Sequence, residues 1–195
     1  MAARGRPLAD NRGRMSDTHI HDPRALRSRA AIRDAFLRLV LEQRYHAISV
    51  RALIAAAGVA RSTFYEHFRG KDEVLADSLR GPFAPLADAI FPDQRPARLA
   101  AILRHFQDNR RLAPGVLAGA AGRRTAAVLA GMVDERLRGS GPLRLPSALV
   151  ATQVAAMQLA VISAWLDGRT QCAADDLALA LARSTAALVD ALRVG

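Results

Sequence analysis

Five polar side chains that can donate hydrogen bonds are concentrated within residues 61–67. They are Arg61, Ser62, Thr63, Tyr65 and His67. Phe64 lies among them and Phe68 follows, so the two phenylalanines are spaced as the inner stripe of a helix. The polar side chains then face outward or flank the exposed side. Hydrogen-bond donors on a helix slim enough for a major groove are what contacts to base edges and phosphates require.

The residues before this segment predict a preceding helix and a turn. Val50, Leu53 and Ala57 repeat at helical spacing, and Ser49 directly before them is a candidate helix cap. Gly58 follows as a residue that can turn the chain with a positive φ. Two short helical patterns joined through a glycine, with a further helix starting near residue 71, predict a helix-turn-helix.

One run of residues contains these features: Gly58-Val59-Ala60-Arg61-Ser62-Thr63-Phe64-Tyr65-Glu66-His67-Phe68, followed by Gly70-Lys71-Asp72-Glu73 and Leu75. It resembles the signature of the tetracycline-repressor (TetR) family of bacterial transcriptional regulators, and the resemblance extends from about Pro23 to Leu75. One departure is Ala60, where the family usually places Ser or Thr as the cap of the recognition helix. Because a lost cap costs roughly 1 kcal/mol, we expect this helix to start less firmly or to rely on Ser62.

The resemblance and the outward positions together predict individual DNA contacts. We expect Arg61, Ser62 and Thr63 to reach base edges, Ser49, Tyr65, His67 and Lys71 to contact phosphate, and Arg51 to reach either. A dimer would present two recognition helices to successive major grooves. Its operator is then palindromic or nearly so, with equivalent faces about 34–36 Å apart or a multiple of that spacing.

The positive charge is concentrated in the N-terminal third. The formal net charge is +10; residues 1–70 contain 13 Arg against 6 acidic residues, whereas residues 71–195 contain 15 basic and 12 acidic residues. A basic excess on one part of a chain raises the local concentration of polyanions. A charge that served solubility alone would not explain this asymmetry, so nucleic acid is the expected partner.

The composition argues against an enzyme, a metal site and a disulfide. Cys172 is the only cysteine, which excludes an intrachain disulfide and a zinc site built on thiolates. The five histidines show no metal-ligand spacing, and neither a catalytic elbow nor a phosphate-binding glycine loop is present. No cofactor is predicted. Because the N-terminal arginines are not followed by an apolar stretch, we expect no secretory signal and a cytoplasmic protein.

Abundant Ala, Leu and Val with few aromatic residues predict an all-α fold. Residues 1–21 are expected to be a disordered basic arm, and 22–80 the helix-turn-helix DNA-binding domain. Within the arm, Arg4-Gly5-Arg6-Pro7 resembles the core of an AT-hook, which lies along a minor groove, although a solvated tail is the simpler interpretation. A first helix should run from Asp22-Pro23 to about Glu42.

Residues 81–195 are expected to form a ligand-binding and dimerisation domain. Gly81-Pro82 and Pro85 should end or kink the fourth helix, and further helices are expected near 97–110, 115–121, 123–138 and 173–192. Residues 147–166 contain no charged residue, and the segment is long enough to span a membrane. A helix that is buried within its own domain and against a partner subunit is the simpler interpretation.

The resemblance implies that the last two helices pair with those of a second subunit and that the C-terminal domain holds an effector pocket. Candidate lining residues are His105, Phe106, Met132, Met157, Gln158 and Trp165, each of which also suits an ordinary core. The predicted function is a dimeric repressor released by an unknown small molecule. A sequence-neutral DNA-coating protein, an enzyme and a membrane-anchored regulator remain as alternatives.

Overall fold

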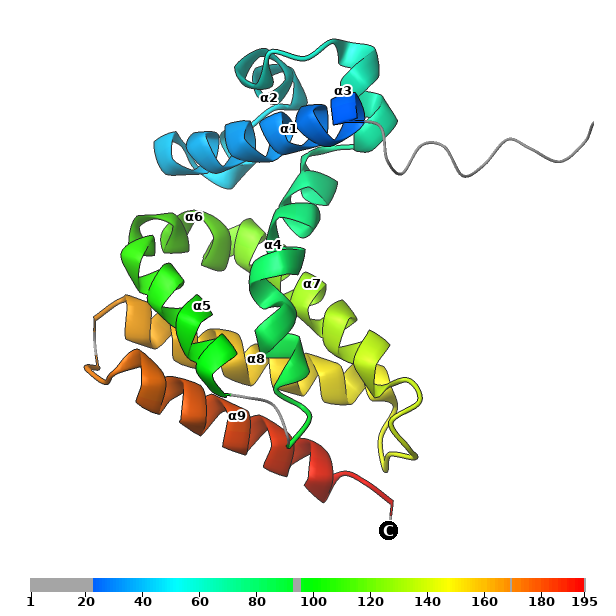
Figure 1. The fold of residues 1–195 in the computed structure, drawn as a ribbon, viewed down its shortest axis with the longest axis vertical. Helices are drawn as coiled ribbons and strands as arrows, with labels where there is room; N and C mark the ends of the chain where they lie inside the picture. The colour runs from blue at the N-terminus through cyan, green and yellow to red at the C-terminus, as the bar shows by residue number, and fades with distance from the viewer. Residues whose placement is uncertain (1–22, 93–95, 169, 195) are drawn as a thin grey trace, which may run out of the picture.

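The computed structural model places helices in two tiers that are connected by one long helix (Figure 1). It describes residues 23–92, 96–168 and 170–194, so the predicted arm and its AT-hook-like motif lie outside the described residues. The prediction of an all-α fold is confirmed: the described residues form helices, with a single β-bridge between Leu143 and Arg193.

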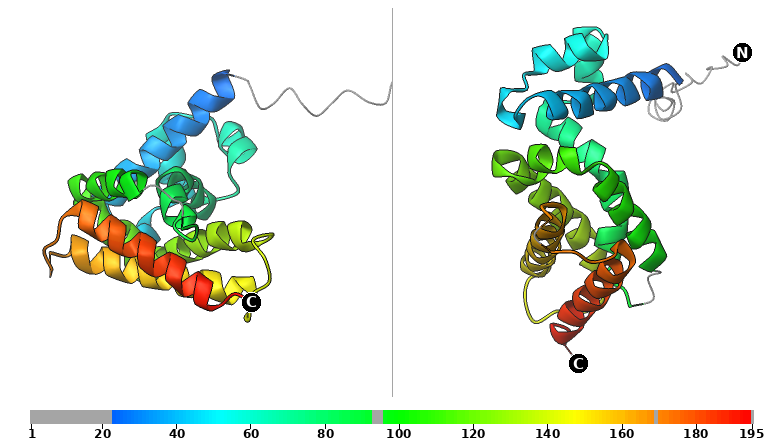
Figure 2. Two further views of the ribbon diagram at one scale, coloured as in Figure 1. Left: turned by 60° about the horizontal axis from the view of Figure 1, so that its bottom comes forward. Right: turned by 90° about the vertical axis from the view of Figure 1, so that its left-hand side faces the viewer.

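The first tier, here called the N-terminal unit, contains α1 (Pro23–Glu42), the short 3-10 turn η2 (Tyr45–Ala47), α2 (Val50–Ala57) and α3 (Arg61–His67). The connecting helix is α4 (Lys71–Asp88). The second tier contains α5 (Pro96–Asp108), the 3-10 turn η3 (Arg110–Leu112), α6 (Ala113–Leu117), α7 (Gly119–Leu137), α8 (Ser147–Leu166) and α9 (Ala174–Ala191). Figure 2 shows α4 passing from the first tier into the second.

The N-terminal unit is held together by apolar side chains from each of its helices. Ile32 and Phe36 of α1, Leu53 of α2 and Phe64 of α3 are fully buried, and Phe68 joins them. Burying a large apolar side chain contributes about 1.5–3 kcal/mol, so these few residues outweigh the weak propensity of the short helices. The stripe predicted from Phe64 and Phe68 is confirmed.

The turn between α2 and α3 has the local structure that the sequence predicts. Ser49 Oγ accepts a hydrogen bond from Ala52 N at 3.1 Å and caps α2. Gly58 ends that helix in the left-handed region at φ 65°, a conformation that a residue with a Cβ rarely adopts. Ala60 precedes α3 without a side-chain cap, and no hydrogen bond from Ser62 replaces it among the described residues. The start of α3 is therefore held by packing.

Gly81-Pro82 and Pro85 are predicted to end or kink the fourth helix, and the prediction that they end it is wrong. α4 continues through Pro82 and Pro85 to Asp88 and crosses the expected domain boundary. Each internal proline removes a backbone hydrogen bond and costs about 3 kcal/mol in an isolated helix. Phe83 and Leu86 on this stretch are buried, at 3% and 0% exposure, and their packing offsets that loss.

The second tier packs around buried faces of α7 and α8. Ser147 Oγ, at the start of α8, donates a hydrogen bond to Asp134 Oδ1 of α7 at 2.5 Å. This bond and the neighbouring Arg138 guanidinium hold the pKa of Asp134 below its ordinary value. α8 is the one described helix that is long and apolar enough to cross a membrane by length and composition, yet its buried residues face the core of this tier.

Two glycines provide a matched test of the backbone. Gly58→Ala should destabilise the protein by about 1 kcal/mol because alanine is strained at positive φ. Gly131 is exposed within α7 and a Cβ there meets nothing within 4 Å, so Gly131→Ala should stabilise by about 0.5–1 kcal/mol. Urea unfolding of both variants measures the free energies; equal effects would contradict the assignment of Gly58 to the turn.

Candidate nucleic-acid interface and ligand pocket

The exposed face of α3 carries most of the predicted base-contacting residues. Arg61 and Ser62 are exposed and Thr63 is half-buried. Tyr65 is 48% exposed, and the Arg61 guanidinium lies 5.5 Å from the centre of its ring. The same ring packs edge-on against buried Phe64 at 5.4 Å, so the inward phenylalanine supports the outward tyrosine. The face combines a cation, hydroxyls and an aromatic ring on one rigid helix.

Ser49 and Arg51 lie at the start of α2, and both are exposed. The cap at Ser49 uses the oxygen as an acceptor, which leaves its O–H free to donate to a phosphate. Arg51 is one residue inside α2 and has its guanidinium available on the exposed surface. The structure is therefore compatible with both roles predicted for Ser49.

Lys71 points into the N-terminal unit. Its Nζ donates to the carbonyl oxygens of Tyr45 at 2.8 Å, Ile48 at 2.7 Å and His46 at 3.3 Å, and lies 4.7 Å from the centre of the Tyr45 ring. The ammonium has three N–H donors, so these carbonyls use all of them. The structure thus assigns Lys71 to closing the η2 turn, and the predicted phosphate contact would require it to leave these partners.

His67 is only partly available for the predicted phosphate contact. Its Nε2 is enclosed and has no hydrogen-bond partner in the structure, and its ring is tilted beside Phe68 at 6.3 Å. The enclosed Nε2 is therefore not placed to contact a phosphate on the exposed side.

Arginines of α1 connect this helix to its neighbours. Arg29 Nη2 lies 2.5 Å from Asp77 Oδ1 on α4, and its hydrogen bond to this carboxylate raises the pKa of Arg29. Arg33 contacts the same carboxylate at 3.8 Å, and Arg38 Nη2 donates to the carbonyl oxygen of Ala56 on α2 at 3.1 Å. Part of the basic excess of the N-terminal third therefore orients helices.

Two further ion pairs hold α4 against α7. Asp72, at the start of α4, accepts a hydrogen bond from Tyr45 Oη and lies 2.6 Å from Arg124 Nη1. Asp88, at the end of α4, lies 2.5 Å from Arg136 Nε. Burial and the Asp72 carboxylate raise the pKa of Tyr45, which keeps its hydroxyl as a donor. Sequence analysis missed these pairs because their partners are 48 or more residues apart.

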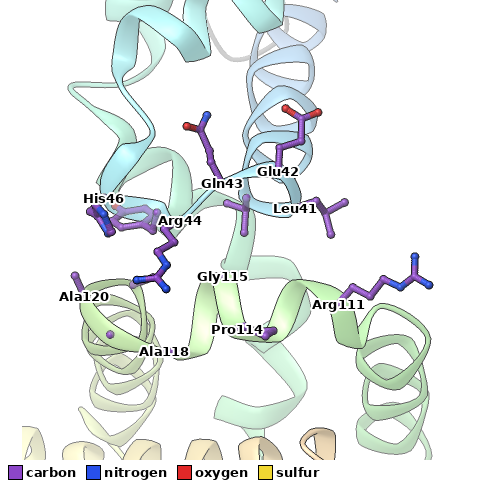
Figure 3. Close-up of a pocket in the computed structure, with 14 residues that line it drawn as sticks. Leu41, Glu42, Gln43, Arg44, His46, Arg111, Pro114, Gly115, Ala118 and Ala120 are labelled. Atoms are coloured by element: carbon purple, nitrogen blue, oxygen red, sulfur yellow. The ribbon is translucent and has the colours of Figure 1, made fainter.

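A groove of about 620 Å³ separates the end of α1 from α6 and the start of α7 (Figure 3). Arg44 points toward the start of α7, whereas Arg111 and Glu42 point away from it. Because these charged side chains diverge, they do not form a binding site for one ion. α6 and α1 are in close contact at Gly115, which also lines the groove. If residue 115 had a Cβ, this atom would lie only 2.4 Å from Val40 Cγ1, so the close approach of the two helices requires a glycine.

A smaller, more apolar pocket of about 140 Å³ lies between α1, α4, α5, α6 and α8. Of the predicted pocket residues, His105 and Phe106 line it. Gln158 and Trp165 are instead buried in the core, where Gln158 Nε2 donates to Leu86 O at 3.0 Å and Trp165 Nε1 donates to Cys172 O at 3.1 Å. Met132 and Met157 do not line this pocket either. The periodic pattern cannot separate core from pocket, since both are apolar.

Comparisons with known proteins agree with this geometry. The profile described as bacterial regulatory proteins, tetR family, matches residues 32–77, which include α2, α3 and the turn between them. Over these residues the chain is similar to the DNA-binding segment of the TetR family. A TetR transcriptional regulator from Streptococcus agalactiae is 25% identical with a TM-score of 0.51, the match covering 83% of this chain and 95% of that one.

Two further similar proteins extend the comparison. A TetR-family regulator from Streptomyces coelicolor shares the fold, with 20% identity, a TM-score of 0.57 and coverage of 87% and 98% of the two chains. An uncharacterized HTH-type transcriptional regulator of Bacillus subtilis, YxbF, is 32% identical over 68 residues. That match covers 34% of this chain, and the chain covers 18% of the length of YxbF.

Lys71 provides a test of this interpretation of the site. Lys71→Ala should lower the free energy of unfolding by about 1–2 kcal/mol, because three carbonyls of the N-terminal unit lose a charged donor. Arg69→Ala removes the same charge from an exposed side chain two residues away and should leave the stability nearly unchanged. Thermal and urea unfolding measure both. A Lys71→Ala variant as stable as Arg69→Ala would contradict the structural role.

Proposed function

We propose that this protein is a TetR-family transcriptional repressor that binds a palindromic operator as a homodimer and is released by a small-molecule effector. The observation that supports it is the outward polar face of α3, which is mounted on the fully buried Phe64. Residues 22–80 act as the DNA-binding domain and 81–195 as the ligand-binding and dimerisation domain. The protein acts in the cytoplasm, where its DNA is.

The contacts with DNA divide by chemistry. Arg61, Ser62 and Thr63 reach base edges, because they occupy the first turn of α3, whose N-terminal residues enter the groove in this motif. Tyr65 and Ser49 donate hydrogen bonds from their hydroxyl groups to phosphate. His67 adds a further phosphate contact, and Arg51 contacts phosphate or a base edge. Lys71 supports these contacts through the η2 turn.

The exposed surface of α8 supports the dimer. The helix has no charged residue, and its exposed positions are Ala148, Leu149, Thr152, Gln153, Ala156, Ala160 and Val161. Leu149 is 55% exposed and Val161 39% exposed. α9 lies beside α8 and exposes Leu179 at 37%. Small side chains let helices from two subunits approach closely, so these faces form a four-helix interface.

A charge placed in this interface tests the dimer and the operator symmetry together. Wild-type protein should protect a two-fold symmetric footprint and sediment as a dimer. Ala156→Arg, on the exposed face of α8, should give a monomer and weaken operator binding at least tenfold, because an unpaired charge would be buried. Ala127→Arg, at an exposed position of α7, is the control and should remain dimeric. Analytical ultracentrifugation and footprinting measure these outcomes; an asymmetric, unrepeated footprint would contradict the model.

Substitutions on α3 test the division of contacts. Tyr65→Ala should weaken binding to operator and random DNA about equally, as expected for a phosphate contact. Thr63→Ala should lower the preference for operator over random DNA, by about 1 kcal/mol or more per operator half-site, as expected for a base contact. Fluorescence anisotropy at fixed salt measures both affinities. If the two variants behave alike the roles are wrong, and wild-type protein without preference would indicate a DNA-coating protein.

A further inference from the structure

The 140 Å³ pocket has one wall from the N-terminal unit itself. Leu37 of α1 lines it together with residues of α4, α5, α6 and α8, and its side chain is 38% exposed. Every other lining residue belongs to α4 or to the second tier. An occupant of this pocket would therefore touch the DNA-binding helices directly as well as the connecting helix.

We propose that this pocket binds a neutral organic molecule of about one aromatic ring, with at most one hydroxyl group, and that the ligand acts on DNA binding through Leu37. The proposal rests on the proposed function and adds to it the class of effector and the residue that senses it. It follows from the size of the pocket, its lining and the position of α1.

The size and lining define the ligand. An apolar cavity of about 150 Å³ lined by Leu, Ile and Phe binds benzene in another protein, and the present pocket has nearly this volume. Its walls are mainly aliphatic and aromatic: Leu37, Leu79, Pro82, Phe83, Phe106, Leu112, Ala113, Val116, Leu117, Leu159, Ile162 and Leu166. No Asp, Glu, Lys or Arg lines it. A charged ligand would lose its hydration without a partner, so a neutral one is favoured.

Three of the lining residues are polar: Ser78, His105 and Asn109. Asn109 Nδ2 donates to His105 O at 2.9 Å and lies 3.3 Å from His105 Nδ1, while Ser78 Oγ donates to Val74 O at 2.8 Å. The Asn109 side-chain oxygen and the lone pairs of Ser78 Oγ remain as acceptors. They suit a single hydroxyl on the ligand, whereas the rest of the pocket suits its ring.

α1 is connected to the recognition surface on its other sides. Phe36 belongs to the buried core that holds α3, and Arg38 Nη2 donates to Ala56 O near the end of α2. On the C-terminal side, Val40 meets Gly115 of α6 with no room for a methyl group. A ligand wedged against Leu37 therefore favours positions of α1 farther from the second tier, and α2 and α3 follow. The shift is limited by the difference in ligand affinity between the two positions.

The test uses phenol as the probe, with benzene as its apolar match and benzoate as its charged match. Saturation-transfer NMR measures binding to the full-length protein, and anisotropy measures operator affinity with and without the probe. Wild-type protein should bind phenol and benzene but not benzoate, and saturating phenol should weaken operator binding about fivefold or more. Leu117→Phe, which fills a half-buried wall, should block phenol binding.

The role of Leu37 is tested by its truncation. Leu37→Ala should still bind phenol, but phenol should then change operator affinity less than about twofold, below typical allosteric coupling. Leu41→Ala is the control, because Leu41 is also exposed on α1 one turn later and does not line this pocket. It should respond to phenol as wild type does.

Each unfavourable outcome identifies what is wrong. Absence of phenol and benzene binding to wild type, with operator binding intact, would overturn the ligand class. Binding without any loss of operator affinity, or an unchanged response of Leu37→Ala, would overturn the role of Leu37. Failure of the ligand-free wild type to prefer its operator would instead overturn the proposed function.

Discussion

The burial of Phe64 is the constraint on which the DNA-facing surface depends. α3 has seven residues and no side-chain cap, and a helix of this length does not form alone in water. Its shape is held because Phe64, at 0% exposure, and Phe68, at 2%, belong to one core with Phe36 of α1. The polar groups on the opposite face are rigid only for this reason.

α4 extends this constraint from one tier to the other. Three of its four carboxylates are held by an arginine of another helix: Asp77 by Arg29 of α1, and Asp72 and Asp88 by Arg124 and Arg136 of α7. Exposed ion pairs contribute little individually, but the Arg136 pair is less than one quarter exposed on both sides. Together they set where α4 stands relative to α1 and α7. Any ligand in the second tier acts against this arrangement.

Local features of the N-terminal unit could be predicted from the sequence. The cap at Ser49, the turn at Gly58 and the uncapped start at Ala60 depend on residues next to one another, so their chemistry is visible in the sequence. The end of α4 could not be predicted in this way. Prolines oppose a helix locally, whereas the burial of Phe83 and Leu86 that overrides them depends on helices that follow later in the chain, chiefly α7, with Phe106 of α5 against Phe83.

The sequence by itself determined the helix-turn-helix, its inward stripe and the resemblance to the TetR family, because helical spacing and turn residues are properties of neighbouring positions. Only the tertiary structure decided that Lys71 faces three carbonyls, that Gln158 belongs to the core, and that Leu37 lines a pocket with α8. A lysine side chain can bind either a phosphate or backbone carbonyls, and a leucine side chain can lie either in a core or in the wall of a cavity. The choice depends on which distant helices pack against them.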